Sequence, residues 1–171
     1  MSTHPSTSAN TTLLPSNKHD HASLSHLSTL PASEWIDLVL YIGPFPGVYP
    51  DNESRGLLTW LQDVNWPIAT PVAKLLLSVM NREESGEEVE KESKGDAMVV
   101  VEAVRRVLGE SDDWQWIYNI LSSIVMQIRD RVWVRRVLGR EMEALRLRVP
   151  GREEGDWGFE GVVAEILGEA E

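Results

Sequence analysis

Residues 60–80 read WLQDVNWPIATPVAKLLLSVM and contain both a helical apolar stripe and two prolines. Its apolar residues recur at the three- and four-residue spacing that places side chains on one face of an α-helix. The stripe consists of Ile68, Val72, Leu75, Leu76 and Val79. Pro67 suits a first helical turn, whereas Pro71 cannot donate a hydrogen bond one turn back. We therefore expect a buried helix that restarts or bends at Pro71.

The same helical period continues on both sides of this stretch. The strongest stripe comprises Ile117, Ile120, Leu121, Ile124, Val125 and Ile128, and shorter stripes occupy 36–40, 57–61, 97–108, 134–145 and 162–167. Strict two-residue alternation, which is typical of half-buried strands, does not occur. Asp20 and the Ser111–Asp113 turn supply helix N-cap residues. The pattern predicts an all-α domain.

Composition excludes several classes of protein. The chain has 171 residues with 16 Lys and Arg against 27 Asp and Glu, a formal net charge of −11. Nucleic acids and anionic membranes attract positively charged surfaces, so we expect neither as a partner. No cysteine is present, which excludes disulfides and thiolate chemistry. No apolar run reaches the ~20 residues of a membrane span, and no secretory or mitochondrial leader is recognisable. We expect a soluble, cytoplasmic protein.

The chain divides into a tail and one domain. Residues 1–12 are polar and are expected to be disordered, and residues 13–171 are expected to form a single helical domain. Residues 43–52, with three prolines and two glycines, cannot continue a helix. Residues 82–96 are rich in Glu and Lys and are predicted to form a flexible acidic insertion. That insertion is either a solvated loop or a docking tail for a basic partner.

A weak internal repeat relates two parts of the chain. An offset of 48 residues aligns Trp66 with Trp114, Val72 with Ile120, and Leu76 with Ile124. Without the acidic insertion, this spacing approaches the ~40–47 residues of helix-pair repeats. The pattern is typical of stacked helical hairpins, in which each pair buries a face against the next.

The motif at 60–77 resembles that of a known family, domain of unknown function 5071. The matching positions are Trp60, Leu61, Gln62, Asp63, Asn65, Trp66, Pro67, Ala69, Pro71, Val72 and Ala73. Segments 13–27 and 100–121 are similar to the family's first segment and next helix pair, and 137–167 matches in outline. The resemblance implies a compact armadillo/HEAT-like stack of about three helical hairpins. It implies no activity.

The turn from Asp63 to Pro67 is the most distinctive candidate site. One hypothesis makes it a recognition site, in which Asp63 and Asn65 supply polar groups and tryptophans supply apolar faces. The tryptophans concerned are Trp60, Trp66 and Trp116, the last predicted to lie nearer the surface than Trp114. The other hypothesis is structural: the polar residues cap a helix start and the indoles fill gaps in the core.

Residues 129–148 are rich in arginine and carry the second candidate site. On a helix, Arg129, Arg136 and Arg140 gather on one side, opposite the apolar stripe. This side is either a docking face for an acidic peptide or phosphate, or a solvated face that pairs internally with the acidic segment 82–96 or the turn at Asp112 and Asp113.

The leading hypothesis is a non-enzymatic helical-repeat module that binds a protein or peptide partner. If the partner docks on the arginine-rich side, it is expected to be acidic. The alternative is a small enzyme or ligand-binding protein with a polar site around His19, Asp20, Asp63 and Asn65. A purely structural subunit without a site is a third option. The His19-Asp20-His21 triplet does not place two imidazoles on one helix face, so no metal and no cofactor is expected. No catalytic motif is recognisable.

Overall fold

The computed structural model describes residue 15 and residues 18–39, 56–81, 87–148 and 158–169, with only the backbone at 37, 38 and 87–94. The described ranges contain α1 (His21–Thr29), α2 (Ala32–Trp35), η2 (Ile36–Val39), η3 (Leu57–Leu61), α3 (Ala69–Met80), α4 (Glu87–Glu110), α5 (Trp114–Ser123), η4 (Val125–Gln127), α6 (Arg131–Arg148) and α7 (Phe159–Leu167), where η marks a 3-10 helix. These ranges hold no strand. The all-α prediction is confirmed. The predicted tail at 1–12 and the proline-rich segment at 43–52 lie outside the described residues.

Helix α3 begins at Ala69 and places Pro71 in its first turn. The missing N–H of a proline costs nothing in a first turn, because no intrahelical acceptor exists for it there. Pro67 instead belongs to the turn that precedes the helix. The predicted stripe is confirmed, since Ile68, Val72, Leu75, Leu76 and Val79 are all buried.

Helix α4 begins much earlier than the sequence predicts. Its first residue is Glu87, so residues 87–96 are helical where a flexible loop was expected, while 82–86 lie outside the described part. The reason is that Glu and Lys are good helix formers, and Glu87/Lys91 and Glu90/Lys94 have the favourable i, i+4 order. With 24 residues, α4 is about 36 Å long.

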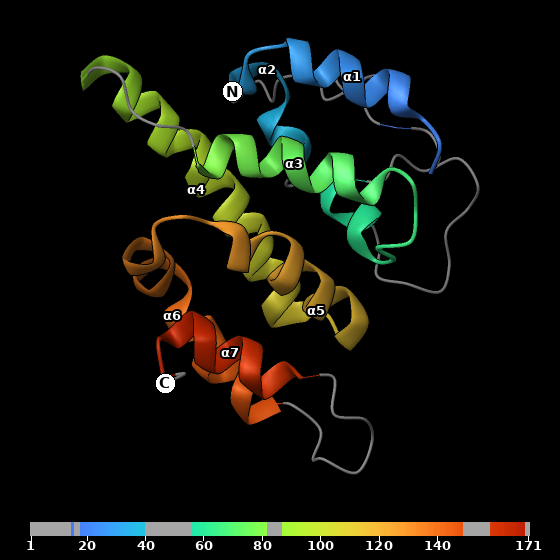
Figure 1. Cartoon of the computed structure of the whole chain (residues 1–171). Coiled ribbons are helices and arrows are strands. Elements are labelled where there is room, and N and C mark those ends of the chain that lie inside the picture. The colour runs from blue at the N-terminus through green and yellow to red at the C-terminus, as the bar shows by residue number, and fades with distance from the viewer. Residues whose placement is uncertain (1–14, 16–17, 40–55, 82–86, 149–157, 170–171) are drawn as a thin grey trace, which may run out of the picture.

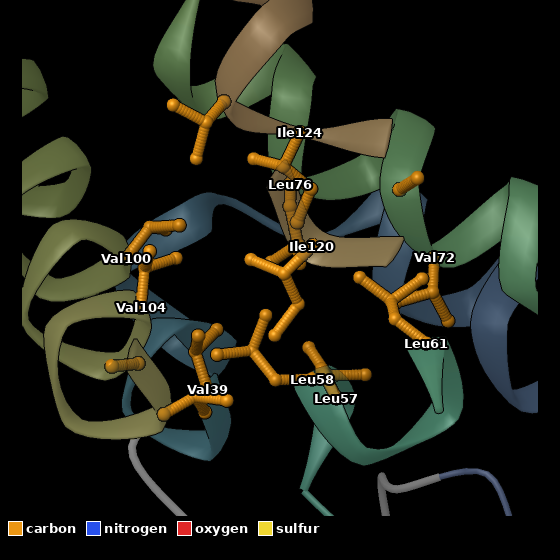
Figure 2. Packing of buried hydrophobic residues seen from close by; sticks show 14 of the residues in the cluster. Val39, Leu57, Leu58, Leu61, Val72, Leu76, Val100, Val104, Ile120 and Ile124 are labelled. Atoms are coloured by element: carbon orange, nitrogen blue, oxygen red, sulfur yellow. The ribbon is translucent and has the colours of Figure 1, made fainter. Parts of the chain in front are cut away.

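The core is one continuous cluster of buried apolar side chains. Figure 2 shows side chains from η2, η3, α3, α4 and α5 meeting in it, with Leu76, Ile120 and Val104 among those that point toward one another. Aligned positions of the weak repeat, Val72/Ile120 and Leu76/Ile124, lie in this same cluster. The two aligned segments therefore pack against each other.

The helices are arranged along the long helix α4. Figure 1 shows α1, α2 and α3 gathered at one end of the molecule and α6 and α7 at the other. Helix α1 packs on α3, α3 on α4, α4 on α6, and α6 on α7. Among the described helices, none is long and apolar enough to cross a membrane.

Candidate functional site

The Asp63 turn is a local structural device. The Oδ1 atom of Asp63 accepts the backbone N–H of Asn65 at 2.8 Å, and its carbonyl accepts the N–H of Trp66 at 3.1 Å. This is the Asx turn that short polar side chains form before a helix. Asn65 is exposed. The carboxylate of Asp63 therefore holds the backbone in the shape that leads into α3.

Two of the candidate recognition tryptophans are core residues. Trp60 is 2% exposed and Trp116 is 1% exposed. Trp66 is half-buried and packs edge-on against Trp60, with 5.8 Å between the ring centroids. Because Trp60 and Trp116 are inaccessible, they cannot offer a surface to a partner. Trp114, predicted to lie deeper than Trp116, is instead the half-buried member of the pair.

Trp116 and Asn119 join α5 to η3. The indole N–H of Trp116 donates to the carbonyl of Leu58 at 2.9 Å. The side-chain amide of Asn119 donates to the carbonyls of Leu61 and Gln62 at 3.1 and 3.0 Å. The last carbonyls of a helix lack partners within it, and here the amide of Asn119, 57 and 58 residues away along the chain, satisfies two of them. Sequence reasoning missed Asn119, because nothing local marks a partner so distant along the chain.

Asp20 is a helix cap, as predicted. Its carboxylate accepts the N–H of Ser23 at 3.1 Å and the hydroxyl of Ser23 at 2.9 Å, at the start of α1. His19 and His21 are exposed. In the described part of the chain, no three His, Asp or Glu residues are grouped closely enough to hold a metal ion. Both carboxylates of the alternative polar site, Asp20 and Asp63, are thus occupied by nearby backbone.

Most arginines of α6 are tied to the rest of the protein. The guanidinium of Arg131 donates to the carbonyls at the end of η4, and that of Arg135 to the carbonyl of Leu167. Arg148 donates to the carbonyls of Leu108, Gly109 and Ser111 and lies 5.7 Å from the Trp114 ring centroid. These contacts hold helix ends and turns in place, so they are structural.

An exposed ion pair joins the ends of α6 and α7. Arg146 donates to the carboxylate of Glu169, and this hydrogen bond lowers the pKa of Glu169 and raises that of Arg146. A lowered carboxylate pKa stabilises the folded state above the unfolded pKa, and this contribution is lost as the pH falls through the folded pKa. The attachment of α7 is therefore weakened only in acid.

Arg136 and Arg140 differ from the other arginines of α6. Both are exposed, and neither has a hydrogen bond or ion pair within the described residues. They stand four residues apart, on the same side of α6 as Val132 and Leu147, which are 58% and 88% exposed. We call these four residues the α6 face. It combines a net positive charge with exposed apolar side chains, and Glu143 on the same side is paired with Arg146 at 3.7 Å.

Two cavities flank Lys74 of α3, a helix at the opposite end of the molecule from α6. The larger, of about 470 Å³, lies between α1 and α3 and is lined by His21, Leu24, Ser25, Ser28, Pro71, Lys74, Leu75 and Ser78. The smaller, of about 240 Å³, is lined by Leu61, Val64, Ala69, Thr70, Ala73, Lys74, Leu77, Ser123 and Gln127. Lys18, His19, Asp20, Asp63 and Asn65 line neither of them.

Comparison with known proteins assigns a family and no activity. A family model described as "Domain of unknown function (DUF5071)" matches residues 52–167, so the chain belongs to that family. The matched region begins just before η3 and ends at the last residue of α7, so it leaves out α1, α2 and η2. No curated protein and no solved structure matches the chain.

Proposed function

We propose that this member of the family is a non-enzymatic interaction module that binds an acidic segment of a partner protein on the α6 face. Arg136 and Arg140 pair with carboxylates of the partner, while Val132 and Leu147 contact its apolar side chains. Arginine suits such a face, because its planar guanidinium binds carboxylates through two parallel hydrogen bonds.

One observation carries the proposal: Arg136 and Arg140 have no partners among the described residues, although the arginines around them do. Arg131, Arg135, Arg146 and Arg148 all bond to carbonyls or carboxylates of this chain. An exposed arginine without an internal partner can bind an external carboxylate without breaking a bond. Two such residues on adjacent turns give one acidic segment two attachment points.

The architecture supports the same class of function. We propose that the helices form an armadillo/HEAT-like stack, because α1, α3, α4, α6 and α7 pack on one another in that order, with α5 packed against η3, α4 and α7. Stacked helices expose helix faces at the ends and sides of the stack, and proteins of this kind use such faces to bind other proteins. This support comes from architecture alone and does not identify the partner.

Affinity capture from the native cell tests the proposal. The double variant R136E/R140E should lose a partner that the wild type retains, because the reversed charges repel an acidic segment. The matched control is K18E/R106E, which changes the net charge by the same amount at exposed positions outside the α6 face. Circular dichroism should show the same helical spectrum for all three proteins.

Peptides from the captured partner then locate the contact. A peptide that covers its acidic segment should bind the wild type and K18E/R106E equally and bind R136E/R140E at least about tenfold more weakly, as expected for two lost charge-assisted contacts. Identical capture by all three proteins would instead favour a purely structural subunit and overturn the proposal.

A further inference from the structure

The larger cavity, the α1–α3 groove, has the composition of an anion-binding site. Its lining includes the side chains of Lys74, His21 and Ser25 and no Asp or Glu among the described residues. The smaller cavity beside it shares Lys74 and also has no acidic lining residue. In a chain with 27 acidic residues, such a concave surface is electrostatically distinct.

Lys74 supplies the positive charge. It is exposed on α3, and no hydrogen bond or ion pair holds its ammonium group among the residues that the structure describes. A cation in a groove, unlike one on a convex surface, acts on a ligand that low-dielectric walls partly surround. The groove therefore favours a negatively charged ligand.

The other polar groups of the groove come from both helices. His21 and Ser25 lie one turn apart on α1, and both are exposed at the rim. The hydroxyl groups of Ser28 and Ser78 donate to the carbonyls of Ser25 and Leu75 at 2.7 Å, so they present their oxygen atoms as acceptors. The groove thus offers donors from Lys74, His21 and Ser25 and acceptors for ligand hydroxyl groups.

The floor of the groove is apolar. Leu24 is 5% exposed, Leu75 is 8% exposed, and Pro71 is half-buried between them and the rim. A volume of about 470 Å³ lies within the range of small-molecule sites. The site therefore has space for an organic group next to the anion.

We propose that the α1–α3 groove binds a small phosphate monoester, with the phosphate at Lys74, His21 and Ser25 and its organic group on Leu24 and Leu75. A tetrahedral phosphate accepts hydrogen bonds from several directions and so suits a point charge with further donors around it. A carboxylate is matched best by the planar fork of an arginine, and the groove lining contains no arginine.

This site is independent of the α6 face. Figure 1 shows α1 and α3 at the opposite end of the molecule from α6. Moreover, α1 precedes the region that the family model matches, so one wall of the groove is contributed by a part of the chain outside the match. A failed test of either site leaves the other intact.

Titration of the full chain with phenyl phosphate tests the proposal by NMR and calorimetry. The backbone amides of Ser25, Lys74 and Ser78 should shift in a saturable way, and phenyl phosphate should bind more tightly than inorganic phosphate because its ring contacts the apolar floor. The variant K74A should bind at least about tenfold more weakly, whereas K74R, which keeps the charge, should bind within about threefold of wild type.

Two controls make the result decisive. K18A removes the same charge from an exposed position outside the groove and should leave binding unchanged. S25W should fill the groove and abolish binding with an unchanged helical spectrum. Equal losses in K18A and K74A, binding of benzoate as tight as that of phenyl phosphate, or no saturable binding at all would each overturn the proposal.

Discussion

At the scale of single residues, Asn119 makes a contact whose removal can be measured. Its amide binds two carbonyl groups at the end of η3, and its side chain is 2% exposed. N119A leaves both carbonyls without this donor in a buried place, so we expect a loss of about 2 kcal/mol in the free energy of unfolding. Urea denaturation followed by circular dichroism measures it.

Asn65 provides the matched control. It is exposed, and the hydrogen bond of its turn uses its backbone N–H. N65A should therefore change the free energy of unfolding by less than about 0.5 kcal/mol. If N119A and N65A proved equally mild, the bonds between Asn119 and η3 would not contribute to stability.

Substitution by alanine should have opposite effects on stability at two glycines of the last helix. Gly168 ends α7 with φ 77°, and its N–H and that of Glu169 bond back to Glu165 and Ala164. G168A should destabilise the protein by about 1–2 kcal/mol, because a side chain disfavours this left-handed conformation. Its Cβ would also displace the guanidinium of Arg135.

Gly161 lies inside α7, and a Cβ added there meets nothing within 4 Å. G161A should therefore stabilise the protein by about 0.5 kcal/mol, because alanine favours the helix. Thermal unfolding of both variants checks the pair, and two shifts of the same sign would contradict it.

The residues that the sequence predicts correctly are those whose role is local. Asp20 and Asp113 are predicted as caps from their positions before expected helices, and each accepts an N–H in the first turn of its helix. The depths of Trp114 and Trp116 depend on which face of α5 meets η3. That contact joins distant parts of the chain, and the tryptophan spacing alone does not reveal it.

At the scale of elements, Arg148 determines how α6 meets the end of α4. Its guanidinium donates to three carbonyls at the α4–α5 turn. A cation at a helix C-terminus also interacts favourably with the helix dipole. R148A should lower the free energy of unfolding by about 1.5 kcal/mol. R148K should not restore it fully, since an ammonium group lacks the fork that reaches several carbonyls.

Arg140 is the control for this prediction, because it is exposed on the same helix without a partner in the described ranges. Chemical denaturation should show R140A within about 0.5 kcal/mol of wild type. A loss as large as that of R148A would mean that Arg140 also has a structural role, which would weaken its assignment to the α6 face.

The helices themselves could be predicted from apolar periodicity. Which arginines of α6 pair with the rest of the protein could be predicted only in part. The arginine-rich segment was recognised, with docking and internal pairing as open alternatives. The structure divides them: Arg131, Arg135, Arg146 and Arg148 pair internally, while Arg136 and Arg140 pair with none of the residues that the structure describes. This division depends on which helix ends lie nearby, and that is a property of the packed fold.

At the scale of the whole molecule, one core predicts one unfolding transition. Leu76 and Leu145 belong to the same buried cluster, and their helices, α3 and α6, lie toward different ends of the molecule (Figure 1). L76A and L145A should each cost about 2–4 kcal/mol and should each leave a single transition. Far-UV circular dichroism and tryptophan fluorescence should give the same midpoint for each variant, and separate midpoints would reveal two independent units.

The spatial order of the helices was beyond prediction from periodicity, although the class of fold was not. Apolar stripes identify which faces are buried, but they do not say which face meets which. The start of α4 shows the same limit: a run of charges predicts a solvated loop, but Glu and Lys at i, i+4 spacing also favour a solvated helix, and α4 begins at Glu87. The α1–α3 groove was missed because it needs residues some 50 positions apart.

The length of α4 has a consequence for dissecting this protein. The helix contributes Val100 and Val104 to the packing with η2 and α3, and Val107 and Leu108 to the buried cluster nearer its other end. A cut between Val100 and Leu108 would leave both products with an uncovered apolar surface. The groove and the arginine-bearing face can therefore be separated by point substitution but not by truncation in this half of α4, and a protease that nicks the helix there should inactivate both together.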